Sequence, residues 1–251
     1  MRLLPLLLLL FTLPGRSQTY PFTRALREAE GAWIRSDTSS KTIYLCFTAH
    51  EFMEGLPFVM QTLQEQQIAA SFFLTGDFVR THPVLTKQLY ADGHYVGAHS
   101  DKHLLYCDWS RRDSLLVPLP AIRKDLTHNI RALQKAGIPP KETRFFMPPY
   151  EWYNKAISED ITRMGYYLVN FTPGTSSNAD YTTPDMKNYL SSDSIMSRIL
   201  RYEQTHRNGL NGFHLLIHVG TDPKRTDKFY HRLPELLNTL KEKGYQFNRF
   251  R

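Results

Sequence analysis

The chain has 251 residues, of which 41% are hydrophobic and 13% aromatic, so it can bury the core of one full α/β domain. This composition excludes a disordered or low-complexity protein. The net formal charge is +7, but lysine and arginine are scattered along the sequence. We therefore expect a solvated basic surface rather than a nucleic-acid partner.

The first 18 residues have the composition of a secretory signal peptide. A basic start at Met1 and Arg2 precedes an apolar run over residues 3–13, and small or polar residues follow it. This run is shorter than the roughly 20 residues that a membrane-spanning helix needs. The sequence therefore predicts export to the periplasm or full secretion, with no transmembrane segment after cleavage near residues 17–19.

Strand and helix patterns alternate from residue 43 onward, with short connections between them. The predicted strands are residues 43–47, 70–74, 95–98, 144–147, 166–171, 214–218 and 245–250. The predicted helices are residues 57–67, 83–91, 121–136, 155–164, 194–206 and 230–243. This alternation predicts a parallel sheet, and the absence of a GxGxxG turn after the first strand favours a barrel over a dinucleotide-binding fold.

Polar residues follow several of these strands, at the end where parallel barrels carry their sites. His99 and His103 follow the third strand four residues apart, a spacing that suits a divalent metal ion, although two surface histidines are the alternative. Other strand ends carry His50, Glu51, Tyr150, Glu151 and His218. This grouping of imidazoles, carboxylates and aromatic rings predicts a metal hydrolase site on one rim.

The order and spacing of these segments resemble the polysaccharide deacetylases of carbohydrate esterase family four, over about residues 43–250. The resemblance is carried by the segments Ala-Ser-Phe-Phe-Leu-Thr-Gly at 70–76, His-Ser-Asp-Lys-His at 99–103, Phe-Met-Pro-Pro-Tyr-Glu-Trp-Tyr-Asn at 146–154 and Leu-Leu-Ile-His at 215–218. It implies an α/β fold, an irregular (β/α)7 barrel, as a single domain at residues 43–251. Residues 19–42 then form a lead-in between the signal peptide and the barrel.

Three positions depart from the pattern of the family. The resemblance places the catalytic base, the third metal ligand and the arginine that orients the base at Thr48, Ala49 and Met147. Losing the base together with the arginine is coherent, because a buried arginine without its carboxylate would be an unpaired charge. His50, Glu51 and Glu151 stand nearby, so we expect a rearranged site.

The resemblance implies that His99, His103 and a third ligand, His50 or Glu51, hold a divalent metal ion, with Zn²⁺ expected. The catalytic candidates are Glu51 or Glu151, to take a proton from water, and His218, to protonate the leaving group. The candidates for binding substrate are Tyr150, Trp152, Asp180 and Tyr181, with Trp109 as a further aromatic side chain near the site.

We therefore expect an exported hydrolase of non-peptide carbon–nitrogen bonds that removes N- or O-linked acetyl groups from a polysaccharide, as a monomer. A catalytically impaired relative that binds glycan, or a hydrolase of the same barrel acting on a non-sugar amide, are the alternatives. Cys46 and Cys107 either pair or remain buried thiols, and the sequence leaves this open.

Overall fold

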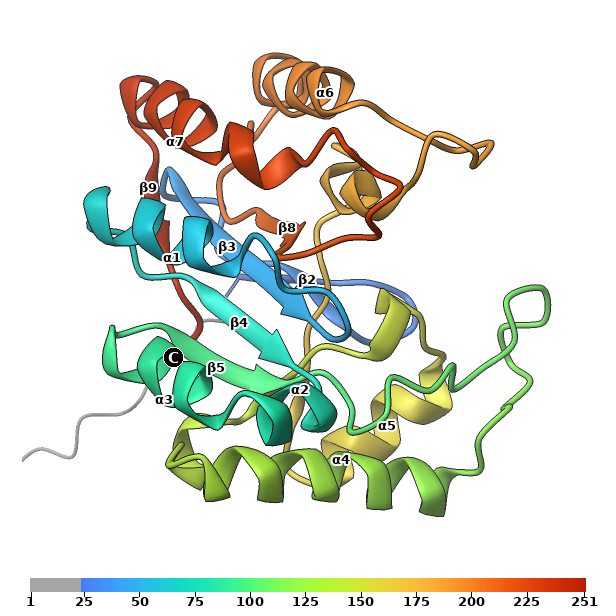
Figure 1. Ribbon diagram of the computed structural model, residues 1–251. Coiled ribbons are helices and arrows are strands. Elements are labelled where there is room, and N and C mark those ends of the chain that lie inside the picture. The colour runs from blue at the N-terminus through green and yellow to red at the C-terminus, as the bar shows by residue number, and fades with distance from the viewer. Residues whose placement is uncertain (1–23) are drawn as a thin grey trace, which may run out of the picture.

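The computed structural model describes residues 24–251, and the predicted signal peptide lies outside them. Parallel strands form one curled sheet in the order β7-β6-β5-β4-β3-β8, and β9 pairs with the first half of β3 (Figure 1). A separate two-stranded ribbon precedes the sheet. The predicted α/β barrel class is confirmed, since each pairing within the sheet is parallel and helices follow the strands.

The strands are β1 Leu26–Arg27, β2 Trp33–Arg35, β3 Thr42–Ala49, β4 Ser71–Leu74, β5 Tyr95–Ala98, β6 Phe145–Phe146, β7 Tyr167–Leu168, β8 His214–His218 and β9 Gln246–Asn248. The α-helices are α1 Leu56–Glu65, α2 Gly76–Thr81, α3 Pro83–Ala91, α4 Leu119–Lys135, α5 Lys155–Arg163, α6 Ser192–Thr205 and α7 Leu233–Glu242. Short 3-10 turns are η1 Pro140–Glu142, η2 Pro149–Glu151, η3 Ser177–Tyr181 and η4 Phe229–Arg232. No helix within 24–251 has the length and apolarity to cross a bilayer.

The gap between β7 and β8 is bridged by β2. Trp33 pairs with Val169 just after β7, and Arg35 pairs with Phe213 just before β8. The Thr172 hydroxyl donates to the carbonyl of Ile34 at the same place. The described part of the predicted lead-in, residues 24–42, thus supplies the strand β2 that joins the two ends of the sheet and makes the barrel irregular.

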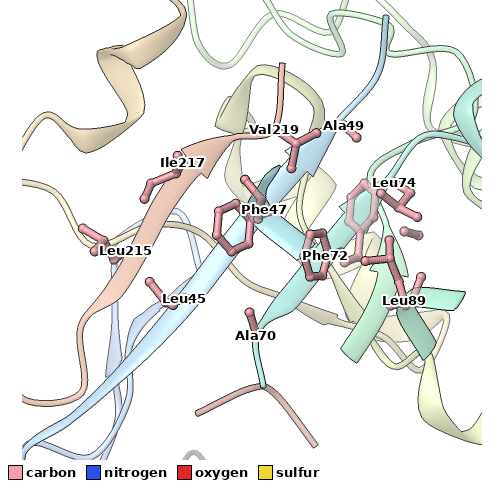
Figure 2. Packing of buried hydrophobic residues seen from close by; sticks show 14 of the residues in the cluster. Leu45, Phe47, Ala49, Ala70, Phe72, Leu74, Leu89, Leu215, Ile217 and Val219 are labelled. Atoms are coloured by element: carbon pink, nitrogen blue, oxygen red, sulfur yellow. The ribbon is translucent and has the colours of Figure 1, made fainter. Parts of the chain in front are cut away.

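Successive side chains of a strand point to opposite faces, and the buried residues divide accordingly into two clusters. Leu45 and Phe47 of β3 pack with Phe72 and Ile217 beneath the surrounding helices (Figure 2). The alternate positions face the interior of the barrel, where Cys46, Phe73, Tyr95, Phe145, Met147, Leu216 and Phe250 form a second cluster. This apolar filling occupies the middle of the barrel, and the polar residues predicted for the site lie above it, at the upper end.

Two features differ from the sequence-based expectations. Residues 75–76 were expected only to end a strand, but α2 begins there because the Thr75 hydroxyl accepts from the Phe78 backbone N–H, at 3.2 Å, as an N-cap. The strands predicted at 144–147 and 166–171 shorten to the two residues each of β6 and β7. Cys46 and Cys107 are both buried free thiols, which settles the question left open by the sequence.

Candidate active site

The inward-facing positions place the predicted site in the top layer of the barrel. Thr48 lies two positions after Cys46 on β3, and His218 lies two positions after Leu216 on β8, so both face the interior of the barrel. His99, four positions after Tyr95, continues the same face beyond the end of β5. Thr48 and His218 are register partners across β3 and β8. The alternation of side chains along each strand therefore places Thr48, His99 and His218 in one layer above the apolar filling.

A cavity of about 550 Å³ opens above this layer. Its lining residues are Thr48, Ala49, His50, Glu51, Phe52, His99, His103, Trp109, Tyr150, Glu151, Tyr181, Met186, His218, Gly220, Thr221 and Asp222. The structure thus brings together all of the predicted catalytic and metal-binding candidates. Of the four predicted substrate-binding residues, Tyr150 and Tyr181 line the cavity, whereas Trp152 and Asp180 lie behind its wall.

His99 is held in one tautomer at the end of β5. Its Nδ1 donates to the carbonyl oxygen of Met147 at 2.9 Å, which leaves a lone pair on Nε2. Burial lowers the pKa of His99 to about 3, so the ring is neutral. A neutral imidazole oriented by a carbonyl is the usual form of a metal-ligating histidine.

His103 and His50 lie beside His99. The His103 ring centroid is 5.1 Å from that of His99 and 4.5 Å from that of His50. Burial lowers the pKa of His103 to about 2, and it also lowers the pKa of His50. Thr75 fixes His50 by a 3.2 Å hydrogen bond between Oγ1 and Nδ1. Three neutral imidazoles therefore meet at the ends of β3 and β5.

Their chemistry fits a divalent cation that accepts nitrogen ligands, and the replacement of the usual carboxylate ligand by Ala49 leaves imidazole as the main donor. The rings of His50 and His103 are stacked with only 14° between their planes, so they do not yet converge. Among the described residues, no three His, Cys, Asp or Glu side chains form a ready-made metal-binding group. A single cation held by all three rings would require a rotation of at least one of these side chains.

The loop from 99 to 103 is anchored by two buried polar side chains on α4 that the sequence analysis did not identify. Asp125 accepts from the backbone N–H of Asp101 at 2.8 Å and from the Tyr106 hydroxyl at 2.7 Å. Asn129 accepts from the N–H of His99 at 2.9 Å and donates to the carbonyl of Leu74 at 3.1 Å. The available signal was their i, i+4 spacing within the apolar stripe of the helix.

Glu151 lies in the floor of the cavity, with its side chain only 9% exposed. Its Oε1 is 3.9 Å from Nε2 of His99, and burial raises the pKa of this carboxyl to about 7. The backbone at Glu151 has φ of 51°, in the left-handed region that favours glycine. Tyr150 precedes it with φ of 59°, so the turn holds two strained residues in succession.

His218 is paired with Asp180, which is buried beneath it on η3. Asp180 accepts from Nδ1 of His218 at 2.6 Å and from its backbone N–H at 2.8 Å. Burial opposes protonation of the ring, but the carboxylate outweighs it and raises the pKa of His218. Asp180, expected as a substrate contact, is thus placed to orient His218 and to stabilise its imidazolium.

The residues that replace the usual base and arginine are neutral and buried. The Thr48 hydroxyl lies in the top layer and has no hydrogen-bond partner among the described residues. Met147 is fully buried in the barrel interior. A carboxylate at Thr48 would have no arginine to pair with, so these two positions are compatible with one another. Glu51 lies exposed at the mouth of the cavity.

Comparisons with known proteins agree with this geometry. The polysaccharide deacetylase family model matches residues 35–169. The chain is 26% identical over 147 residues to the peptidoglycan-N-acetylmuramic acid deacetylase PdaA of Bacillus subtilis, covering 58% of this chain and 52% of that protein. It is also 26% identical over 191 residues to a peptidoglycan-N-acetylglucosamine deacetylase of Bacillus cereus, covering 76% and 78% of the two chains. The chain thus spans about half the length of PdaA.

Solved structures share the fold. The crystal structure of a CE4 family pseudoenzyme from Bacillus anthracis superposes with a TM-score of 0.68 at 19% identity, covering 88% of this chain and 68% of that one. The structure of PdaA gives a TM-score of 0.65 at 23% identity, covering 87% and 82%. With a family model that matches more than half of its residues, this chain belongs to the polysaccharide deacetylase family, as a divergent CE4 member.

Proposed function

We propose that this protein is an exported, metal-dependent hydrolase that removes acetyl groups from a glycan by means of a rearranged set of residues. The single observation that carries this proposal is Glu151, a buried carboxyl held in strained backbone beside His99. Strained backbone that carries a buried carboxyl next to an imidazole is typical of functional sites. The composition of residues 1–18 supports their action as a signal peptide.

The proposed ligands of the cation are His99, His103 and His50, and we expect Zn²⁺ because it accepts three imidazoles readily. Such a cation, when bound, polarises the acetyl carbonyl group and makes a water molecule more acidic. His50 replaces the missing carboxylate ligand in this scheme. The fixed tautomer of His99 and the anchoring of its loop by α4 support the assignment.

Glu151 is the proposed general base. Its carboxyl group is close to His99 and close enough to His218 for the two to influence each other electrostatically. It can therefore receive the proton of a water molecule that attacks the acetyl carbon. Glu51, at the exposed mouth, is less suited to this step because solvent screens it.

His218 is the proposed general acid, oriented by Asp180. When the tetrahedral adduct collapses, the bond between the acetyl carbon and the sugar nitrogen or oxygen breaks. The leaving atom takes a proton from His218, and acetate departs. Asp180 compensates the charge of the protonated ring before this transfer, as their 2.6 Å contact allows.

The relatives act, by their names, on N-acetylmuramic acid and on N-acetylglucosamine in peptidoglycan. An N-acetylated amino sugar is accordingly the first substrate to test, with an O-acetylated glycan as the alternative ester.

The test combines metal analysis of the purified protein with acetate release from these glycans. We expect one equivalent of zinc and acetate release that Glu151→Gln lowers by about 10² to 10⁴-fold, because the amide cannot accept the proton. Retention of wild-type turnover in this variant would contradict the assignment of the base. Gln61→Ala, an exposed change on α1, is the matched control.

A catalytically impaired glycan-binding protein is the second candidate, and the replacements at Thr48, Ala49 and Met147 favour it. One structural neighbour is by its title a CE4 family pseudoenzyme, and a mutant of it has restored activity. Zinc with glycan binding but no acetate from any acetylated glycan would select this candidate. Turnover of small non-sugar amides alone would contradict both candidates and indicate a hydrolase of non-sugar amides.

A further inference from the structure

The walls of the cavity carry exposed aromatic rings on two sides. Trp109 is 55% exposed, and Tyr150 and Tyr181 are each 44% exposed, although each contributes to the cavity. Tyr150 contacts His103, with 4.4 Å between ring centroids, whereas Tyr181 contacts His218 at 5.6 Å. We call Trp109, Tyr150 and Tyr181 the aromatic rim. Its members flank the two ends of the polar cluster.

Trp109 belongs to the long loop between β5 and α4, and the backbone of this loop extends away from the sheet in Figure 1. The Trp109 ring lies 5.3 Å from that of Trp152 at an angle of 31°, and the Arg112 guanidinium lies 4.3 Å from the Trp152 ring. Arg112 also donates to the carbonyl of Tyr153 at 2.7 Å. Trp152 is thus a support between Arg112 and Trp109, and Trp109 offers the free surface.

The charge of the cavity contrasts with the basic chain. None of the described residues that line it is lysine or arginine, whereas Glu51, Glu151 and Asp222 are acidic. The neighbouring lysines Lys228 and Lys102 lie outside the lining, and Lys228 also donates to the backbone carbonyl of Asp222 at 2.9 Å. Lys228 contacts Glu54 at 2.8 Å, and Lys102 contacts Asp77 at 2.5 Å.

We propose that Trp109 binds the glycan by stacking on a sugar ring next to the acetylated one, and that Glu51 and Asp222 in the same lining disfavour a carboxylate group on that glycan. Stacking needs an apolar sugar face and an exposed, rigid ring, both of which the rim provides. A carboxylate on the glycan would meet Glu51 and Asp222 with no lysine or arginine in the lining to compensate it, whereas a cation held by the histidines would attract it. This inference rests on the proposed function in assuming an acetylated glycan, but it concerns how the glycan binds and not how the acetyl group is removed.

Binding is measured by calorimetry with the Glu151→Gln protein, in which turnover is slowed, and it is measured with and without zinc so that the charge of the cation is separated from that of the carboxylates. The probes are the tetramer of N-acetylglucosamine and the same tetramer carrying lactyl carboxylates on alternate sugars. Without zinc, we expect the acidic tetramer to bind at least fivefold more weakly at low salt, with a smaller difference at high salt because exposed charges are screened. Equal or tighter binding of the acidic tetramer without zinc would overturn the charge argument.

The role of Trp109 is tested with the neutral tetramer. Trp109→Ala should weaken binding about tenfold, as for truncation of an anchoring aromatic side chain, and Trp109→Phe should restore most of it. Leu116→Ala is the matched control, since Leu116 is 52% exposed on the same loop and does not line the cavity. Unchanged binding of Trp109→Ala would refute the assignment.

Asp222→Asn removes a negative charge from the lining of the cavity without changing the shape of the side chain. The amide keeps an acceptor for the 2.8 Å bond from the backbone N–H of Lys224, so the loop is preserved. We expect it to strengthen binding of the acidic tetramer about twofold and to leave the neutral tetramer unaffected. If selective binding is found but no glycan releases acetate, the proposed function fails while this inference stands.

Discussion

The ends of β5 and β3 meet in one site but differ in how far they follow the family. At β5, His99 and His103 match the metal-ligand pattern, and Asp125 and Asn129 on α4 hold their loop from behind. At β3, the base and the carboxylate ligand are replaced by Thr48 and Ala49. The two strand ends therefore differ in support as well as in sequence, and under the proposed function His50 would supply the donor that Ala49 lacks.

The sharpest test of this contrast is His50→Ala. If His50 has taken over as third ligand, its loss should lower zinc affinity about a hundredfold or more, because two imidazoles alone hold zinc weakly. Competition with a chromogenic chelator measures the affinity. His128→Ala removes a histidine of α4 outside the cavity and should leave the affinity unchanged. Wild-type zinc affinity in His50→Ala would show that His50 is not a ligand and that His99 and His103 are the only histidines that bind the cation.

The support behind β5 is tested by Asp125→Asn. The amide cannot accept all the bonds that Asp125 accepts from Asp101, Lys102 and Tyr106, so a buried donor loses its partner. We expect the free energy of unfolding to fall by about 2 kcal/mol and zinc affinity to fall about tenfold. Urea unfolding and the chelator assay measure the two. Lys124→Ala on the exposed face of α4 is the control, and an unchanged affinity would deny Asp125 its role in positioning.

His94 separates the effect of burial from that of metal binding, since it precedes β5 at the opposite end from the site. Burial lowers the pKa of His94 to about 4, and its Nδ1 accepts from the N–H of Ala70 at 3.1 Å. The unfolded chain takes up this proton near pH 6.5, so the stability it contributes is complete above pH 6.5 and is lost as the pH falls toward 4.

His94→Asn retains an acceptor for Ala70 but does not titrate. We expect it to remove about 2 kcal/mol of the decrease in unfolding free energy between pH 7 and pH 4, with or without zinc. Denaturant unfolding across this pH range measures the difference. If the stability gained by His94→Asn at low pH depended on zinc, the acid sensitivity would arise at the proposed metal site and not at His94.

The smallest expected effect concerns backbone strain at Glu151. Glu151→Gly should relieve the left-handed backbone and remove a buried carboxyl, so the free energy of unfolding should rise by about 1 kcal/mol while acetate release is lost. Gln67 has φ of 54° and is exposed outside the site, so Gln67→Gly should stabilise similarly with activity unchanged. Destabilisation in Glu151→Gly alone would mean that the carboxyl serves the fold.

The sequence by itself determined the α/β alternation, the polar ends of the strands and the meeting of His50, His99, Glu151 and His218, because side-chain periodicity is local and parallel strands share one edge. It could not show that β2 joins the ends of the sheet, nor that Asp180 lies under His218. These contacts connect residues 38 or more positions apart, as in the bonds from His218 to Asp180 and from Thr172 to Ile34. Only the packing of the whole chain decides such pairings, because no local sequence pattern shows which distant donors and acceptors must form hydrogen bonds with each other.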